Sequence, residues 1–391
     1  MSSMHIVDGN TLTLLRNGEE YFPRLIATID AAVQSIYLET YIFSADESGR
    51  MVSAALRRAA KRGVSVHLLM DGFGSAGFPH EWVDELRAAG VAVLWFRPEI
   101  TRFNLRRHRL RRLHRKLAVV DERIAFVGGI NIIDDVPGGS ITLPRLDYAV
   151  EVQGYAAERI HATMKNLWGR VSWTNFRRRL GRKNRKLHPA QAGEQGGNVI
   201  VLLRDNLRHR RDIEQAYLIA FGDAQREIII ANAYFLPGLR LRRALLNAVR
   251  RGVRVMLLLQ GRVEYRLQHY ATQALYDELL SAGVEIHEYQ ASYLHAKVAV
   301  VDGFWTTVGS SNIDPFSLWL GREANLVVRD AGFAESLRAN LLHEISNAGR
   351  PVEHSAWRAK SWWKRLLFRI SYAVLRMLTG LIGYARGGDD V

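Results

Sequence analysis

Short apolar runs rich in β-branched residues alternate along this chain with stretches of helical periodicity. Residues 64–70 and 228–230 have the composition of buried strands. Residues 51–62 have a helical pattern, and Gly63 follows at the position where a glycine commonly ends a helix. Alternation of strands and helices predicts an α/β sandwich with a largely parallel sheet.

The order of these elements occurs twice. Five stretches of the first half resemble five of the second: residues 10–17 and 198–205, 35–43 and 228–236, 57–69 and 246–258, 85–91 and 278–284, and 113–121 and 294–302. A repeat in constant order predicts a duplicated unit of strand, helix, strand, helix and strand. We expect a first unit at 1–176, a basic and Gly-rich linker at 177–197, a second unit at 198–350 and an amphipathic tail at 357–386.

The composition limits the binding partners and the kinds of active site that this chain can have. The chain of 391 residues has a formal net charge of +15, and a field of that sign attracts phosphate groups of nucleic acids or anionic membranes. It has no cysteine, which excludes disulfides, thiolate metal sites and cysteine nucleophiles. The first ten residues have no apolar core of a signal peptide, and no window of about 20 apolar residues predicts a transmembrane helix.

One motif occurs at the same place in both repeats. Its members are His114, Lys116, Asp121 and Asn131 in the first copy, and His295, Lys297, Asp302 and Asn312 in the second. Each copy has the spacing His-x-Lys-x4-Asp, and a glycine and then the asparagine follow at the same distances. A single copy is weak evidence, but two copies in register predict a functional site.

These residue types suit the chemistry of a phosphodiester. Residues two apart in a strand share a face, so each His–Lys pair points one way, and packing about a pseudo-dyad would bring the two pairs together. The lysines would neutralise the non-bridging oxygens, one imidazole would attack phosphorus, and the other would protonate the leaving alkoxide. We expect no metal or cofactor, because lysines supply the positive charge. The alternative is two core histidines beside exposed lysines.

Further residues are predicted to support the histidines. A carboxylate that begins a later strand in each half, Asp147 or Glu323, would fix the imidazole tautomer, and we expect Asp147 to orient His114. Asn131 and Asn312 would donate amide hydrogens to phosphate. The motif includes Asp121 and Asp302 in the candidate catalytic set, but both follow the strand, and we interpret them as structural groups that bind turn amides.

The paired motifs resemble those of the phospholipase D superfamily, over about residues 8–350. The stretches at 38–43, 70–75, 113–116, 231–238 and 307–318 resemble the bacterial cardiolipin synthases of the B type. The resemblance implies a duplicated α/β sandwich with one shared site and a phosphohistidine at His114, with His295 as acid and then base. It also implies a phosphatidyltransferase that makes cardiolipin from phosphatidylglycerol. The alternatives are a hydrolytic phospholipase D, a nuclease, and a non-catalytic basic protein that binds membranes or nucleic acid.

Two segments predict contact with an anionic phospholipid surface. Residues 98–113 form a connection that is longer than its counterpart in the second half, with arginines at 102, 106, 107, 109, 111 and 112. Residues 362–384 would form a helix with a basic face and an apolar face, typical of a helix that lies in the membrane interface. We therefore expect a peripheral protein on the cytoplasmic face of the cell membrane, with no nucleic-acid partner. For the arginine-rich segment the alternatives are a generic basic loop and a nucleic-acid groove. For the helix the alternative is docking on the protein's own core.

Overall fold

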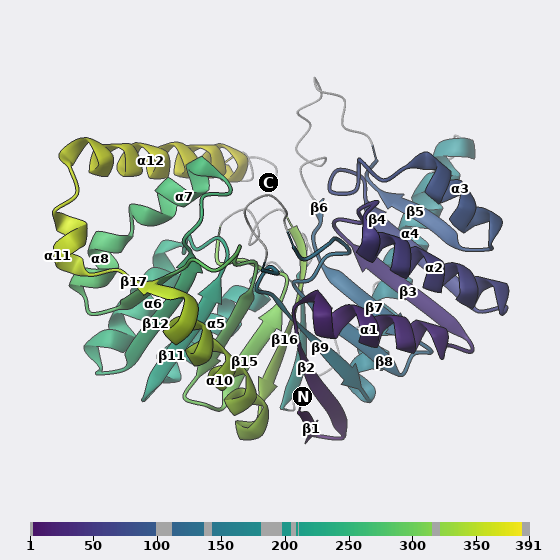
Figure 1. Ribbon diagram of the computed structural model, residues 1–391, viewed down its shortest axis with the longest axis horizontal. Coiled ribbons are helices and arrows are strands. Elements are labelled where there is room, and N and C mark those ends of the chain that lie inside the picture. The colour runs from purple at the N-terminus through teal and green to yellow at the C-terminus, as the bar shows by residue number, and fades with distance from the viewer. Residues whose placement is uncertain are drawn as a thin grey trace, which may run out of the picture.

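The computed structural model describes residues 3–98, 112–136, 143–180, 198–204, 209, 211–314 and 321–384. They form two α/β units that lie side by side (Figure 1). The fold is therefore the predicted duplicated α/β sandwich with an additional C-terminal helix.

The first unit contains residues up to the long helix that ends it. Its strands are β1 (Met4–Val7), β2 (Asn10–Arg16), β3 (Ser35–Thr40), β4 (Ser65–Asp71), β5 (Ala92–Phe96), β6 (Arg112–Leu113), β7 (Lys116–Val120), β8 (Ile124–Gly128) and β9 (Tyr148–Gln153). Its helices are α1 (Asn17–Asp30), α2 (Glu47–Lys61), α3 (His80–Ala88) and α4 (Tyr155–Leu180). Helix α4 extends into the predicted linker, and residues 181–197 of that linker lie outside the described residues.

The second unit repeats this plan. Its strands are β10 (Val199–Arg204), β11 (Glu227–Asn232), β12 (Arg254–Gln260), β13 (Glu285–Tyr289), β14 (Lys297–Val301), β15 (Trp305–Gly309), β16 (Gly321–Arg329) and β17 (Gly349–Pro351). Its helices are α5 (Asp212–Asp223), α6 (Leu239–Arg250), α7 (Arg266–Gln273), α8 (Tyr276–Ser281), α10 (Ala331–Ala348), α11 (His354–Arg358) and α12 (Trp362–Tyr384).

The two sheets have the same strand order. It is β2-β9-β8-β7-β3-β4-β5 in the first unit and β10-β16-β15-β14-β11-β12-β13 in the second. In each sheet only the last three strands of that order are mutually parallel, while the others pair antiparallel. The prediction of a largely parallel sheet is therefore wrong. The helical connections that suggested it occur only around β3–β5 and β11–β13, and short turns join β7 to β8 and β14 to β15.

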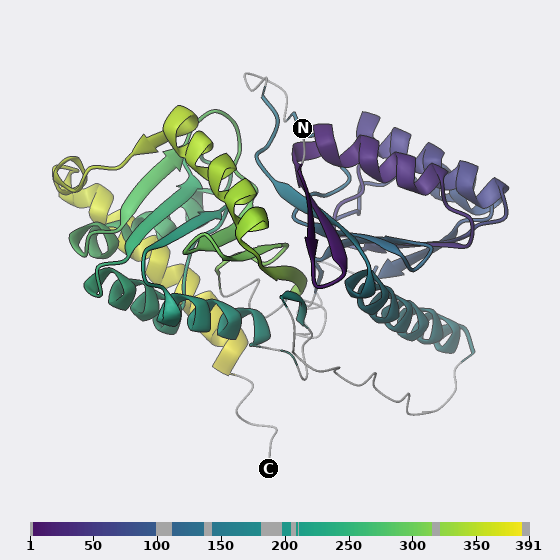
Figure 2. The ribbon, with the colours of Figure 1, turned by 90° about the horizontal axis from the view of Figure 1, so that it is seen from below.

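Helices pack on the faces of both sheets. Figure 2 shows α1 and α2 on one face of the first sheet and α4 on the other. Apolar side chains of α1–α3 pack on the first sheet, and those of α5–α8 pack on the second. Helix α2 shows how the sequence specifies these elements: its buried positions recur at helical spacing, and the Asp46 carboxylate caps it by accepting the Gly49 amide hydrogen.

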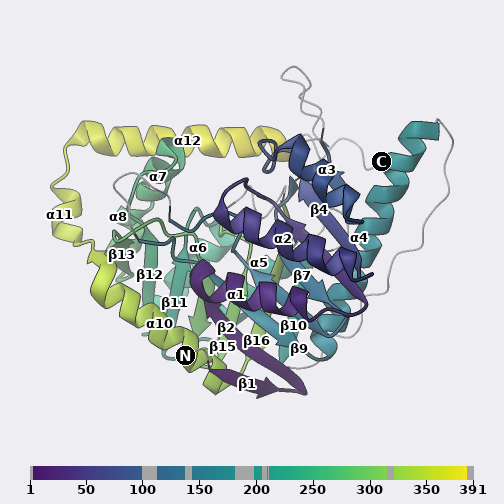
Figure 3. The same ribbon diagram turned by 45° about the vertical axis from the view of Figure 1, so that its right-hand side comes forward.

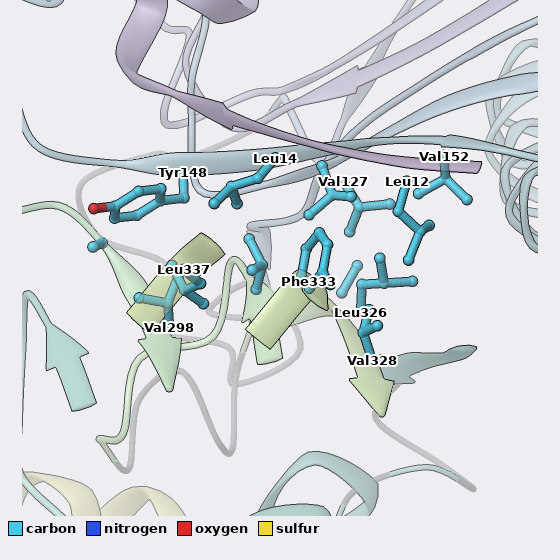
Figure 4. Close-up of a cluster of buried hydrophobic side chains, with 14 of the residues drawn as sticks. Leu12, Leu14, Val127, Tyr148, Val152, Val298, Leu326, Val328, Phe333 and Leu337 are labelled. Carbon is cyan, nitrogen blue, oxygen red and sulfur yellow. The ribbon is translucent and has the colours of Figure 1, made fainter. Parts of the chain in front are cut away.

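A third apolar cluster joins the two units. It contains side chains of β2, β7, β8 and β9 from the first unit and of β14, β16 and α10 from the second. Figure 4 shows Leu12, Val127 and Tyr148 on one side of this interface and Leu326 and Phe333 on the other. All five residues are fully buried, with 0% of their surface exposed. The interface is therefore a core shared by the two units, and it fixes their relative position.

Candidate active site

Each His–Lys pair lies at the start of an equivalent strand. Lys116 begins β7 and Lys297 begins β14, and each histidine lies two residues before its lysine. The Lys116 ammonium donates to the His114 carbonyl over 2.6 Å, and Lys297 donates in the same way to the His295 carbonyl. Both histidines line one cavity of about 490 Å³ between the units. The structure thus brings together the pairs that the two motifs predicted.

The histidines pair with carboxylates of the opposite unit. The Nδ1 atom of His114 lies 3.1 Å from Oε2 of Glu323, and Nδ1 of His295 lies 2.6 Å from Oδ2 of Asp147. The prediction that Asp147 orients His114 is therefore wrong. The carboxylate and imidazole of each pair come from different halves of the chain.

Backbone hydrogen bonds across the pseudo-dyad cause this exchange. Strand β6 pairs in parallel with β16, and the His114 amide donates to the Arg322 carbonyl over 3.0 Å. On the opposite side the His295 amide donates to the Leu146 carbonyl over 2.9 Å. Each histidine is therefore hydrogen-bonded to the residue that precedes its carboxylate partner.

Burial determines the charge state of the site. The side chains of Lys116 and Lys297 are 3% and 0% exposed, and burial lowers the pKa of both, that of Lys116 to about 7. Burial also lowers the pKa of His114 and of His295, although Glu323 and Asp147 oppose the shift. At neutral pH both imidazoles are consequently neutral. Since an ionised carboxylate only accepts, each Nδ1 carries the hydrogen and Nε2 keeps its lone pair.

Glu323 and Asp147 differ in the residue that lies next to each carboxylate. The Ser310 hydroxyl donates to Oε2 of Glu323 over 2.5 Å. Burial raises the pKa of Glu323, but His114, Lys116 and this Ser310 contact together lower it below its usual value. In the first unit the equivalent position is Gly129, where an added Cβ would lie 2.3 Å from Oδ1 of Asp147. Sequence reasoning missed Ser310 as a partner of Glu323. The available signal was a serine, Ser310, at the position where the first copy has Gly129.

The predicted asparagines lie at equivalent turns. Asn131 lines the cavity, and its Oδ1 accepts the Ile42 amide hydrogen over 3.1 Å. Asn312 is 3% exposed. Their predicted donation to phosphate stays a prediction.

The two motif aspartates lie at the other end of their strands. Asp121 accepts the amides of Val33, Gln34 and Ser35 at 2.7–2.9 Å. Asp302 does the same for residues 225–227. The structure therefore does not bring Asp121 and Asp302 to the catalytic cavity, and their contacts agree with the structural interpretation.

Among the described residues, an aromatic ring packs against His114 and none packs against His295. The ring of Tyr41 lies 4.8 Å from that of His114, centroid to centroid, and the Lys116 ammonium lies 5.4 Å from the Tyr41 ring. Tyr41 follows the end of β3 directly, and the residue that follows β11 in the same way is Ala233. The duplicated site is therefore not symmetric.

Comparisons with known proteins agree with this architecture. The chain matches the family described as "Cardiolipin synthase, PLD-like domain" over residues 25–136 and 217–345. The chain belongs to this family. It is 40% identical over 380 residues to proteins named cardiolipin synthase B from Shigella flexneri and from Escherichia coli K12, covering 96% of this chain and 90% of each relative. It is 30% identical to cardiolipin synthase A of Erwinia tasmaniensis, over 94% of this chain and 75% of that protein.

Solved structures support the fold of this cardiolipin synthase family member. The crystal structure of phosphatidylserine synthase from Haemophilus influenzae matches with a TM-score of 0.67, covering 95% of this chain and 94% of that one. Its sequence is only 14% identical, so the match bears on the fold alone.

Proposed function

We propose that this phosphatidyltransferase makes cardiolipin and glycerol from two molecules of phosphatidylglycerol. The names of the relatives give cardiolipin as the product, and the family resemblance gives phosphatidylglycerol as the substrate. The single observation that carries the proposal is that two imidazoles line one cavity, each paired with a carboxylate and each bonded through its carbonyl to a buried lysine. A phosphodiester in that cavity would meet a nucleophile, a proton donor and two cations.

The reaction takes two displacement steps. In the first, Nε2 of His114 attacks phosphorus, the bond to the glycerol oxygen breaks, and His295 supplies the proton to the leaving oxygen. In the second, His295 takes the proton of an acceptor hydroxyl, the oxygen attacks phosphorus, and the nitrogen–phosphorus bond breaks. The family resemblance assigns the nucleophile to His114. Binding of the phosphodiester anion raises the pKa of His295, which lets it carry the proton for the first step.

Lysine charge is the electrostatic part of this mechanism. Each phosphorus displacement accumulates negative charge on the non-bridging oxygens, and Lys116 and Lys297 are fixed by their bonds to the histidine carbonyls. A buried cation interacts with this charge more strongly than an exposed one, because less water screens it. Burial of the lysines therefore favours the transition state.

Helix α12 is the part of the molecule that we expect to contact the membrane. One stripe of it, with Phe368 and Leu375, is buried in the core of the second unit, and Figures 1 and 3 show α12 lying along α7. A second stripe exposes apolar side chains: Trp363, Leu366, Leu367, Ile370, Val374, Met377 and Leu378. Exposed arginines at 365, 369 and 376 lie between the two stripes. The helix thus both docks on its own unit and presents an apolar surface.

This helix also reaches the catalytic cavity. Leu375 and Leu378 line the cavity together with Leu267 of α7. An apolar exposed surface that continues into the cavity suits a substrate whose acyl chains stay in the bilayer. No helix within the described ranges is long and apolar enough to span a membrane. We propose a peripheral arrangement on the cytoplasmic face of the membrane, which the exposed apolar stripe of α12 supports.

The activity is tested by incubating the purified chain with phosphatidylglycerol vesicles and measuring the products by mass spectrometry. We expect equimolar cardiolipin and glycerol, and no cardiolipin from His114→Ala. Formation of phosphatidic acid without cardiolipin would show that the chain is a hydrolase and not a transferase. Cleavage of DNA without turnover of lipid would favour a nuclease.

The membrane contact is tested by vesicle co-sedimentation of Trp363→Ser. Trp363 is 53% exposed on α12. The matched control is Phe304→Ser, because Phe304 is 50% exposed in the turn between β14 and β15, away from α12. We expect weaker sedimentation with anionic vesicles for the Trp363 variant alone. Equal binding of both variants and the unaltered chain would contradict the assignment of α12.

A further inference from the structure

A polar cluster lies in the wall of the catalytic cavity and takes no part in the steps above. Its members are Arg145, Tyr234 and Glu264. The Tyr234 hydroxyl donates to Oε2 of Glu264 over 2.8 Å, and a guanidinium nitrogen of Arg145 lies 3.8 Å from Oε1 of Glu264. The Nε atom of Arg145 is buried and has no hydrogen-bond partner among the described residues. The cluster therefore has an unused donor, and its carboxylate has further acceptor capacity.

The cluster lies on the His295 side of the cavity. The Arg145 guanidinium lies 5.7 Å from the ring centroid of Tyr293, two residues before His295. The backbone of Leu146, next to Arg145, accepts the His295 amide hydrogen. Tyr234 follows Ala233, whose amide donates to the carbonyl of Ala296 over 3.0 Å. Both Arg145 and Tyr234 are thus within one residue of a backbone contact to the His295 segment.

The other side of the cavity has no equivalent cluster at the matching positions. Counted from the ends of the equivalent strands, Tyr234 corresponds to Ile42 and Glu264 to Ser75. Counted from the carboxylate partner of each histidine, Arg145 corresponds to Gly321. A group needed equally by both histidines would be duplicated with the motif. Beside His114 a guanidinium nitrogen of Arg112 lies 3.8 Å from Asp71, but that pair comes from other positions and does not line the cavity. Among the described residues, a cavity-lining Arg–Tyr–Glu cluster is therefore a feature of the His295 side.

We propose that Arg145, Tyr234 and Glu264 form the subsite that binds the acceptor headgroup and selects a neutral alcohol with adjacent hydroxyl groups. This rests on the proposed function, in which His295 takes the proton of the acceptor hydroxyl. One hydroxyl lies at His295, and its neighbour donates to the Glu264 carboxylate while accepting from the exposed part of the Arg145 guanidinium. Tyr234 holds the carboxylate in place.

Charge balance selects the class of headgroup. The guanidinium of Arg145 compensates the carboxylate of Glu264, so the subsite offers a donor and an acceptor without a strong net field. A neutral diol satisfies both groups, whereas a mono-alcohol leaves both unsatisfied, which is costly in a buried site. Asp135 also lines the cavity, with its carboxylate bonded to the Gly18 amide. An ammonium headgroup would gain from these carboxylates but would be repelled by the guanidinium.

The test is a competition between acceptors that reports a product ratio. Phosphatidylglycerol vesicles are incubated with the full chain and equal concentrations of isotope-labelled glycerol, 1-propanol and ethanolamine. Labelled phosphatidylglycerol, phosphatidylpropanol and phosphatidylethanolamine are then counted by mass spectrometry. The ratio does not depend on the absolute rate, so a partly impaired variant remains informative.

We expect the unaltered chain to favour glycerol over both competitors. In Glu264→Gln the glycerol-to-propanol ratio should fall about tenfold, because one charge-assisted hydrogen bond is lost. Tyr234→Phe removes a single oxygen and should lower the ratio less, which provides a second variant if Glu264→Gln fails to fold. The control Glu285→Gln removes a carboxylate that pairs with Arg254 at the surface, and its ratio should not change.

Four outcomes would overturn the proposal. A ratio near one in the unaltered chain, or an unchanged ratio in both variants, would exclude the subsite while leaving the transferase activity in place. A preference for ethanolamine would exclude the proposed selection of a neutral alcohol with adjacent hydroxyl groups. Absence of any phosphatidyl transfer by the unaltered chain would instead refute the proposed function, and the subsite with it.

Discussion

The crossed pairing of histidines and carboxylates leads to a quantitative prediction for Glu323→Gln. Glu323 is 1% exposed, and its carboxylate contacts Nδ1 of His114 and the hydroxyl of Ser310. Glutamine has the same shape, so the Ser310 contact and the packing can persist. The negative charge that stabilises positive charge on His114 is lost. In addition, the amide can donate to Nδ1, which would move the imidazole hydrogen to Nε2 and block attack on phosphorus.

The magnitude follows from the geometry of the pair. Two unit charges about 4 Å apart interact by about 4 kcal/mol at an effective dielectric constant of about 20. The imidazole carries part of a unit charge in the transition state, so we expect a loss of about 3 kcal/mol. That corresponds to a fall on the order of a hundredfold in kcat. The pKa of His114 should also fall further, since Glu323 is the group that raises it.

Two measurements check this reasoning. Quenched-flow mass spectrometry should detect less phosphatidyl-His114 in Glu323→Gln, whereas Asp147→Asn should slow its consumption. NMR titration of the two imidazoles should show the Glu323 variant shifting His114 and the Asp147 variant shifting His295. If instead the Glu323 variant shifted His295 and the Asp147 variant shifted His114, each carboxylate would pair with the histidine of its own half. That result would refute the crossed arrangement. Urea unfolding serves as the control for an intact fold.

The remaining predictions concern protonation and stability. Because burial lowers the pKa of Lys116 to about 7, kcat/KM should fall as pH rises through about 7, when the ammonium loses its proton. In Lys116→Arg, whose guanidinium stays charged, this alkaline fall should disappear, and a profile identical to that of the unaltered chain would exclude Lys116 as its source. At the far end of β14, three backbone amides outweigh the effect of burial and lower the pKa of Asp302. Asp302→Ala should reduce the free energy of unfolding by about 1–2 kcal/mol. A depressed pKa stabilises the fold fully above the unfolded-state value of about 3.9, so the difference between the chains should shrink below that pH and be lost as pH falls through the lower pKa of the folded state. Urea titrations at several pH values measure this, and a pH-independent difference would contradict it.

Local patterns in the sequence were sufficient for several features. The order of apolar runs and helical stretches predicted a duplicated α/β unit, because burial on one or both faces dictates those periods wherever the element lies. The two His-x-Lys motifs predicted one phosphodiester site, because identical residues at identical spacing in a repeat fold into identical local structure. The apolar and basic stripes of residues 362–384 were likewise a local property of one helix.

Contacts between distant segments depended on the tertiary structure. Glu323 and Asp147 lie at equivalent positions, and only the pairing of β6 with β16 and of Leu146 with Leu294 decides that each meets the histidine of the opposite unit. The same holds for the mostly antiparallel sheets, whose register involves residues far apart in the chain. It also holds for Tyr41 and the cluster around Glu264, which break the symmetry of the repeat. A sequence specifies each unit through local propensity and burial, whereas packing between the units selects which equivalent groups meet.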